Sequence, residues 1–310
     1  MMLSFLLRRL AVGLFTIWGV LTAVFLIVRL APGDQATVAL GPDAAPEQIA
    51  ELRHTLGLDR PVLVQYLSFL GDAVRGDFGE SYRYGRPAMD AVLERFPATV
   101  TLTLAATVIA IAVGIVLGVV AGHRPGSLVD RTTSAVTLGL QALPPFWVGI
   151  MLILVLALWL RLLPSTGGGD LEHLILPAIT LSIPFTALVG RITRSGVAET
   201  MSEAFVRTAR SKGLTEREVL TGHVLKNSLV PVVTVVGLQV GTLLGGAVVI
   251  ETVFAWPGLG NLLVGAVGNR DYAVVQAATV LIAVCVIVLN LAADLAYARL
   301  DPRIRLEARR

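Results

Sequence analysis

Cysteine and histidine are scarce in this chain of 310 residues. The only cysteine, Cys285, lies inside an apolar run, which excludes an intrachain disulfide and a metal site built from cysteines. No H-E-x-x-H motif or other metal-ligand spacing connects the four scattered histidines, His54, His123, His173 and His223. We therefore expect this chain to bind no metal.

Lysine is scarcer than arginine, and the motifs of common enzymes are missing. Neither of the two lysines, Lys212 and Lys226, ends a G-x-x-x-x-G-K-[ST] loop, in which backbone amides hold the phosphates of a nucleotide. There is also no G-x-S-x-G turn to present a nucleophilic serine. We therefore expect that the chain is not an enzyme and does not itself hydrolyse ATP.

Charged residues make up only 15% of the chain, whereas hydrophobic residues make up 55% and the mean hydropathy is +0.77. This composition is typical of membrane proteins. The net charge of +3 is small, and the basic residues are scattered or lie at the ends of apolar runs. The sequence therefore does not indicate a surface for nucleic acids.

Long apolar runs are abundant. A membrane-spanning helix needs roughly 20 apolar residues, and six runs meet this need, at about 10–28, 98–121, 133–160, 174–192, 229–250 and 273–297. The first run is too long for the hydrophobic part of a secretory signal, so we expect a retained anchor. The sequence thus predicts an all-α membrane protein with six transmembrane helices.

The basic residues predict the orientation of these spans. With a cytoplasmic N-terminus, most of the 25 basic residues lie on the inner side, as the positive-inside rule requires. Both termini are then cytoplasmic. This orientation divides the chain into an N-terminal end with the first span, an external region, a core with a cytoplasmic loop at 193–229, and a cytoplasmic tail, at 1–28, 29–97, 98–297 and 298–310.

The external region at 29–97 is too long to lack structure in a compact protein. Helical patterns at 46–58 and 62–74 precede a turn-rich stretch at 76–87. We expect an external cap that packs on the ends of the spans, with direct ligand contact as the alternative.

Two spans carry glycine at every fourth position, which allows helices to approach closely. These glycines are Gly114, Gly118 and Gly122 in the second span, and Gly237, Gly241 and Gly245 in the fifth. The third span contains Pro144 and Pro145, which should kink it.

Polar side chains within the spans are few, and this scarcity of carboxylates counts against a proton-coupled carrier. Gln141 and Gln239 are interpreted as packing residues or as pore lining, and Asp294, with Asn290 one turn earlier, as a packing or a passage residue. The pore candidates are therefore Gln141, Pro144, Pro145, Gln239, Asn290 and Asp294.

The longest polar stretch in the second half of the chain, 200–231, predicts a helical hairpin. Thr200 with Glu203 and Thr215 with Glu218 fit two capping boxes, and Gly213 lies between them, where the first helix needs a left-handed exit. Leu214 and Val219 are spaced as a hydrophobic staple for the second helix.

The first helix of this hairpin has two predicted faces. Phe205, Thr208 and Ala209 share one side, whereas Arg207 and Arg210 lie on another, and Glu203 is spaced to pair with Arg207. Such a hairpin suits the docking of a soluble partner.

The segment 205–214, FVRTARSKGL, resembles the cytoplasmic coupling loop of ABC importer permeases of the dipeptide/oligopeptide family, whose pattern is close to Y-V-R-T-A-R-A-K-G-L. The Glu-Ala-Ala pattern of importers in general is met only in part, by Arg207, Thr208 and Ala209 with Gly213. Further matches to the first permease of such a pair occur in order at 56–61, 76–81, 95–99, 251–260, 270–272 and 300–303.

This resemblance implies a type I ABC importer transmembrane domain in the cytoplasmic (inner) membrane. The partners that it implies are a second homologous permease, two cytoplasmic ABC ATPases that bind ATP and Mg, and an external solute-binding protein, with no cofactor in this chain. The ATPase-coupling residues that it implies are Glu203, Ala204, Phe205, Arg207, Thr208, Ala209, Arg210, Lys212 and Gly213.

The function that follows is a permease forming half of the translocation pore for di-/oligopeptides or a similar small solute. The resemblance also admits importers of nickel chelates, glutathione, opines or sugars, and the spans do not discriminate among these. Two alternatives remain open at this point: a secondary carrier driven by an ion gradient, and a non-transporting scaffold.

Overall fold

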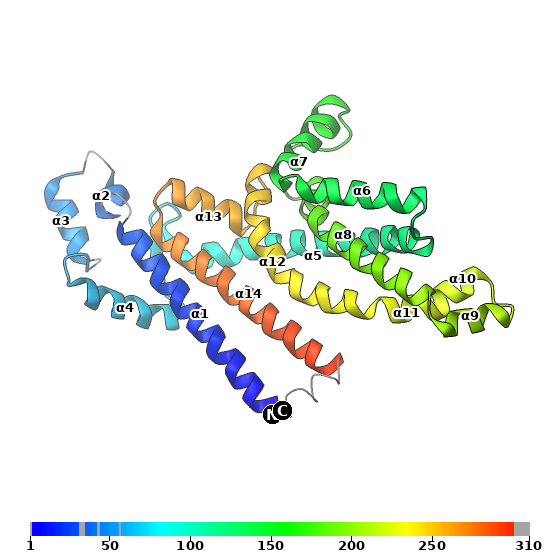
Figure 1. The fold of residues 1–310 in the computed structure, drawn as a ribbon. Helices are drawn as coiled ribbons and strands as arrows, with labels where there is room; N and C mark the ends of the chain where they lie inside the picture. Colours follow the sequence, from blue (N-terminus) through cyan, green and yellow to red (C-terminus); the bar gives the residue numbers. More distant parts are fainter. Residues whose placement is uncertain (1, 31–34, 42–43, 56, 301–310) are drawn as a thin grey trace. The chain divides into compact units, whose positions relative to one another are not determined.

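The structure is a computed structural model that describes residues 2–30, 35–41, 44–55 and 57–300. Most of the expected tail at 298–310 and of the motif at 300–303 therefore lies outside the described residues. The chain divides into two compact units, Met1–Thr99 with Pro257–Val288, and Val100–Trp256 with Leu289–Arg310. Helix α5 (Ala88–His123) and helix α14 (Tyr272–Leu300) each pass from one unit into the other (Figure 1).

The first unit is built on apolar helices. Besides the relevant parts of α5 and α14, it contains α1 (Met2–Leu30), α2 (Gln35–Leu40), α3 (Pro46–Thr55), α4 (Val62–Val74) and α13 (Leu259–Gly268). Its core joins α1, α5, α13 and α14 through buried residues such as Leu21, Val92, Leu259 and Val274. The helical pattern predicted at 62–74 is confirmed as α4, whereas the one predicted at 46–58 is confirmed only over Pro46–Thr55, because residues 57–59 form a turn.

A small hairpin occupies the turn-rich stretch before α5. Strands β1 (Glu80–Ser81) and β2 (Arg86–Pro87) pair antiparallel, with Ser81 opposite Arg86. The buried Ser81 hydroxyl donates a hydrogen bond to the carboxylate of Asp271, which lies between α13 and α14. The hairpin is therefore fastened to the rest of the first unit by a contact between residues far apart in the sequence.

The second unit contains the remaining helices and both sites considered below. Its elements are the rest of α5 and α14, α6 (Leu128–Ala142), α7 (Pro145–Leu152), the π-helix η1 (Ile153–Trp159), α8 (Leu171–Met201), α9 (Ala204–Ser211), α10 (Glu216–Val219), the π-helix η2 (Leu220–Val224), α11 (Leu225–Ser228) and α12 (Val230–Val253). In this unit α8 packs against α6, α7, α11 and α12.

Four helices in the described part are long and apolar enough to cross a membrane, and two bent helix pairs raise the number of spans to six. One pair, Leu128–Ala142 with Pro145–Trp159, bends by 102°. The kink predicted at Pro144 and Pro145 is therefore confirmed, but it breaks the span at 133–160 into two helices. Each proline disfavours helical backbone in the residue before it, and Leu143 and Pro144 are accordingly extended, with ψ of 137° and 128°.

The glycines of the second span form a close seam between α5 and α8. A Cβ added at Gly114 would lie 2.8 Å from Val189 Cβ, one at Gly118 would lie 2.5 Å from Thr193 Cβ, and one at Gly122 would lie 2.6 Å from the Arg194 carbonyl oxygen. Only glycine allows this approach, so the predicted seam is confirmed.

The glycines of the fifth span, in α12, do not form an equivalent seam. A Cβ at Gly237 would lie 3.3 Å from Ala293 Cβ of α14, whereas a Cβ at Gly245 would meet no atom within 4 Å. Glycines at every fourth position are therefore not sufficient to predict a close contact along the whole helix, because a second helix must also run along the face that carries these glycines.

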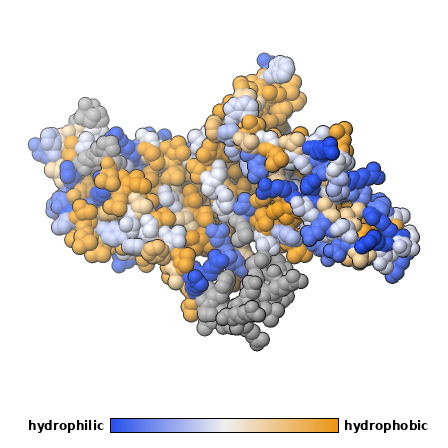
Figure 2. Space-filling model, viewed as in Figure 1, coloured by the Kyte–Doolittle hydropathy of each residue, from blue (hydrophilic) through white to orange (hydrophobic). Residues whose placement is uncertain are grey.

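Hydrophobic residues dominate the visible surface, and hydrophilic residues gather over α9 and α10 (Figure 2). Exposed apolar side chains include Phe15, Leu104, Val108, Val233 and Val288. Apolar side chains in lipid carry no penalty of exposure to water, so such a surface is expected of membrane spans.

Candidate functional site: the α9–α10 hairpin and a cavity between helices

Helix α9 ends in the left-handed exit that the sequence predicts at Gly213. This glycine has φ of 84°, and its N–H donates to the carbonyl of Arg210 at 2.9 Å. The N–H of Leu214 donates to the carbonyl of Ala209 at 3.4 Å. Together these two bonds form a Schellman motif, which satisfies carbonyl groups that the helix end would leave unpaired.

The second capping box of the hairpin is confirmed. The Thr215 hydroxyl accepts the N–H of Glu218 at 3.4 Å, and the Glu218 carboxylate accepts the N–H of Thr215 at 2.8 Å. Because α9 and α10 both have well-defined ends at the same turn, the short connection between them is fixed by hydrogen bonds on both sides.

The first predicted capping box, Thr200 with Glu203, is wrong. Thr200 is buried in the last turn of α8, which continues to Met201. Helix α9 begins after Glu203, whose side chain forms no capping hydrogen bond. Tertiary packing along the 31-residue α8 overrides the local signal for a helix start at Thr200.

The hairpin has its own apolar core, which also defines the outward face of α9. Val206 and Ala209, three residues apart, are buried with Val197 of α8, Val219 and Val224, and the staple residue Leu214 packs against this cluster. The predicted grouping of Phe205 with Ala209 is therefore wrong, because Ala209 faces inward. Phe205 is 41% exposed instead.

Charges on the hairpin are distributed unequally. The guanidinium of Arg210 forms a bidentate ion pair with Glu216, at 2.7 and 3.1 Å, and this pair joins α9 to α10. The predicted pair between Glu203 and Arg207 does not occur. Within the described residues, Arg207 and Lys212 are exposed cations without a carboxylate partner.

The other predicted coupling residues lie on the same short helix or at its ends. Glu203, Ala204 and Thr208 are exposed, and the Thr208 hydroxyl donates to the Ala204 carbonyl at 3.1 Å. The predicted set is thus brought together as one small polar surface, with Ala209 beneath it.

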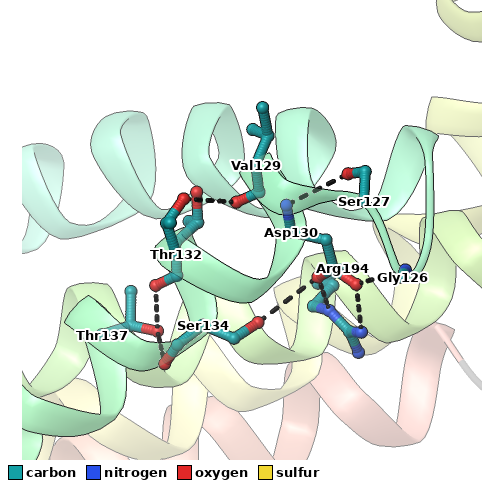
Figure 3. Close-up of polar contacts among 9 residues, drawn as sticks. Gly126, Ser127, Val129, Asp130, Thr132, Ser134, Thr137 and Arg194 are labelled. Carbon is teal, nitrogen blue, oxygen red and sulfur yellow. Dashed lines mark hydrogen bonds and ion pairs between the residues drawn. The ribbon is translucent and has the colours of Figure 1, made fainter.

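An ion pair that the sequence reasoning missed joins α6 to α8. Asp130 is 2% exposed, and its carboxylate accepts hydrogen bonds from both Nε and a terminal nitrogen of Arg194, the latter at 2.7 Å (Figure 3). The Gly126 N–H donates to the same carboxylate at 2.8 Å, and the Ser134 hydroxyl does so at 3.4 Å. The sequence does contain a local signal for the start of α6, because Ser127 stands three residues before Asp130 and its hydroxyl accepts the Asp130 N–H at 3.2 Å. This spacing does not identify Arg194, which is distant in the sequence.

This ion pair borders a cavity of about 260 Å³ between α5, α6 and α8. The pore candidate Gln141 lines the cavity together with Thr133, Thr137, Arg191 and Arg194. Hydroxyl, amide and guanidinium groups therefore meet in one place between apolar helices, although Arg194 is held by Asp130 and the Thr137 hydroxyl donates to backbone carbonyls.

The remaining pore candidates lie elsewhere in the second unit. Pro144 and Pro145 form the break between α6 and α7, and Gln239 is half-buried in α12. Asn290 is exposed and Asp294 is half-buried in α14. Since Gly237 of α12 approaches Ala293 of α14, Gln239 and the α14 pair lie on neighbouring helices.

The fold and the hairpin define a membrane-embedded transport component, and comparison with protein families agrees. Residues 114–306 match the binding-protein-dependent transport system inner membrane component, and residues 2–103 match the N-terminal region of this membrane component. The chain belongs to this family, and it is a permease of an ABC importer.

Comparison with individual relatives shows which permeases of this family the chain is similar to. The chain is 40% identical to the di/tripeptide transport system permease protein DppB of Pseudomonas aeruginosa (strain UCBPP-PA14), over 98% of this chain and 99% of that protein. It is also 40% identical to the glutathione transport system permease protein GsiC of Escherichia coli (strain K12), with the same coverage. Within the family, the chain is therefore similar to permeases for short peptides.

Solved structures support the same fold. The MetNI methionine ABC transporter, in an inward-facing conformation, matches with a TM-score of 0.57 and 19% identity, over 69% of this chain and 97% of that chain. An amino acid ABC transporter matches with a TM-score of 0.53 and 15% identity, over 68% and 94%. The expected fold of a type I ABC importer transmembrane domain is thereby confirmed. Family membership also favours the importer over a secondary carrier or a scaffold.

Proposed function

We propose that this permease lines half of a translocation pore for short peptides and couples it to cytoplasmic ATPases through α9. A second homologous permease supplies the other half of the pore. Two ATPase subunits bind ATP and Mg, and an external solute-binding protein delivers the solute. In this arrangement both termini and the hairpin are cytoplasmic, and 29–97 is external.

The outward face of α9 is the observation that carries the proposal. An aromatic side chain that is 41% exposed, Phe205, is unusual in a polar hairpin, and the exposed cations Arg207 and Lys212 lie on the same short helix and at its end. Aromatic and arginine side chains on one exposed surface are typical of a protein–protein contact. Arg210 contributes differently, because its ion pair with Glu216 stabilises the hairpin itself.

The contacts of α9 support the transmission of force. Val206 of α9 packs against Val197 of α8, and Gly122 of α5 approaches α8 at Arg194, one turn before Val197. Close packing makes such helices move as units rather than deform. Movement of α9 by a partner therefore displaces α8, which also lines the cavity between α5, α6 and α8 through Arg191 and Arg194.

Short peptides are the proposed solute because the similar permeases DppB and GsiC are named for di/tripeptide and glutathione transport. Nickel chelates, opines and sugars remain the alternatives. The ligand that copurifies with the external binding protein would decide among them.

The coupling role is tested in reconstituted transporter with two variants, Phe205→Ala and Arg207→Gln. Loss of a central anchor costs about 2 kcal/mol or more at many interfaces, so ATPase copurification and ATP-dependent uptake should both fall. Arg217→Gln is the matched control, since Arg217 is also exposed but lies on α10. Normal uptake and copurification in both α9 variants would contradict the proposal.

A further inference from the structure

A second cavity, of about 370 Å³, lies within the first unit. It is formed by the end of α1, the end of α3 with Gly57 and Arg60 after it, α4, the loop before β1, and Gln276 of α14. Its volume is within the range of pockets that hold small molecules. The charged and amide side chains that line it are Arg29, Arg60, Gln65, Asp72, Asp77 and Gln276.

The two arginines of this cavity provide unused hydrogen-bond donors. The guanidinium of Arg29 lies 5.3 Å from the centre of the Phe25 ring, which holds it without occupying its N–H groups in the ring plane. Within the described residues neither Arg29 nor Arg60 forms a side-chain hydrogen bond or an ion pair. A carboxylate matches the planar donor geometry of a guanidinium.

The same cavity also contains unused acceptors. The amide nitrogen of Gln65 donates to the carbonyls of Leu58 and Arg60, at 3.1 and 2.7 Å, which fixes the orientation of the amide. Its oxygen, Oε1, is buried and lacks a partner in the part of the chain that the structure describes. A buried acceptor without a donor is costly and calls for an explanation.

Two carboxylates complete the set of acceptors. Asp77 Oδ1 accepts the Gly79 N–H at 2.9 Å, so its second oxygen remains available. Asp72 pairs with Arg75 at 3.5 Å and accepts the Ser68 hydroxyl at 3.4 Å, both at exposed positions. The lining therefore combines two carboxylates and an orphan amide oxygen with two cations that have no ion-pair partner among the described residues.

We propose that this cavity binds a small zwitterion, an amino acid or a short peptide. Its carboxylate contacts Arg29 and Arg60, and its ammonium group contacts Asp77, whose second carboxylate oxygen is not used by Gly79. The proposal shares its solute class with the proposed function, but it depends on the cavity alone and does not require coupling through α9.

Binding is measured with radiolabelled L-alanyl-L-alanine on the assembled transporter in phosphatidylcholine nanodiscs, without ATP and without the external binding protein. Loss of one charged hydrogen-bonding partner weakens a ligand by about 10- to 100-fold. Arg60→Gln and Arg29→Gln should each weaken binding by this factor. Arg83→Gln, which changes an exposed arginine of the same unit outside the cavity, should leave binding unchanged.

Modified dipeptides test separately whether the ammonium group and the carboxylate of the ligand are recognised. N-acetyl-alanyl-alanine and alanyl-alanine amide should each bind at least tenfold more weakly, because each lacks one charge. If both arginine variants, in folded transporter, bind the dipeptide as tightly as the unmodified transporter, the proposal is overturned, as it is if the unmodified transporter does not bind the dipeptide at all. Abolition of dipeptide binding by phosphatidylethanolamine in the nanodisc would also overturn it, since the cavity would then hold a lipid headgroup. If binding fails while α9 variants still uncouple transport, only the cavity proposal is lost.

Discussion

Substitution of Gly118 by alanine should loosen the packing of α5 on α8. The added Cβ would lie 2.5 Å from Thr193 Cβ and 2.6 Å from the Gly190 carbonyl oxygen. Both distances are well below van der Waals contact, and one of the two atoms belongs to the backbone. The helices must therefore move apart, because rotation of a side chain cannot relieve the clash with a carbonyl.

The expected cost follows from overpacking of a closely packed interface, which is about 1–3 kcal/mol. Gly139→Ala is the matched control, because a Cβ at Gly139 in the last turn of α6 meets no atom within 4 Å. In that open position alanine should gain up to about 1 kcal/mol of helix propensity. The two variants should therefore differ by about 1–4 kcal/mol.

The difference is measured as the free energy of unfolding of the purified chain in mixed micelles, followed by circular dichroism during denaturant titration. Gly118→Ala should unfold at a lower denaturant concentration than the unmodified chain, and Gly139→Ala should not. Equal stability of the two variants would refute the assignment of the α5–α8 seam.

Two further predictions concern the hairpin and the ion pair. Gly213→Val should lower ATP-dependent uptake while membrane insertion persists, because a β-branched residue at φ of 84° is strained by about 1–2 kcal/mol. The control is Gly222→Val in η2, which adds the same side chain where no atom lies within 4 Å. An equal loss of uptake in both variants would contradict this reasoning. Asp130→Asn should lower the Tm of the purified chain more than Ser134→Ala does. The first change leaves the Arg194 charge without its bidentate partner, whereas Ser134 contributes only a 3.4 Å contact to Asp130. Equal Tm values for the two variants would show that the ion pair is not structurally important.

Features governed by local chemistry could be predicted from the sequence. The exit at Gly213 and the box at Thr215 depend on residues within a few positions of one another, and both are confirmed. The length of the apolar runs predicts the spans, because the thickness of the bilayer sets how many apolar residues a spanning helix needs. The break at Pro144 is also local, although its angle of 102° is not set by the prolines alone.

Features governed by distant partners could not be predicted. Thr200 carries a valid capping signal, yet the packing of α8 keeps it inside the helix. Asp130 finds Arg194 across 64 positions of sequence, and no spacing rule relates them. The inward face of α9 likewise depends on Val197 and Val224 from neighbouring elements, which is why Ala209 rather than Phe205 is buried.

Cysteine cross-linking at Phe205 tests the central claim, the coupling of this permease to an ATPase through α9, most directly. With Cys285 replaced by alanine, Phe205→Cys supplies a single reactive thiol on α9, and Val74→Cys supplies an equally single control on α4, where Val74 is 87% exposed. In intact cells, Phe205→Cys should cross-link to the ATPase subunit and resist membrane-impermeant reagents, whereas Val74→Cys should react with them. Labelling of Phe205→Cys from outside the cell, or its failure to cross-link in active transporter, would contradict the account.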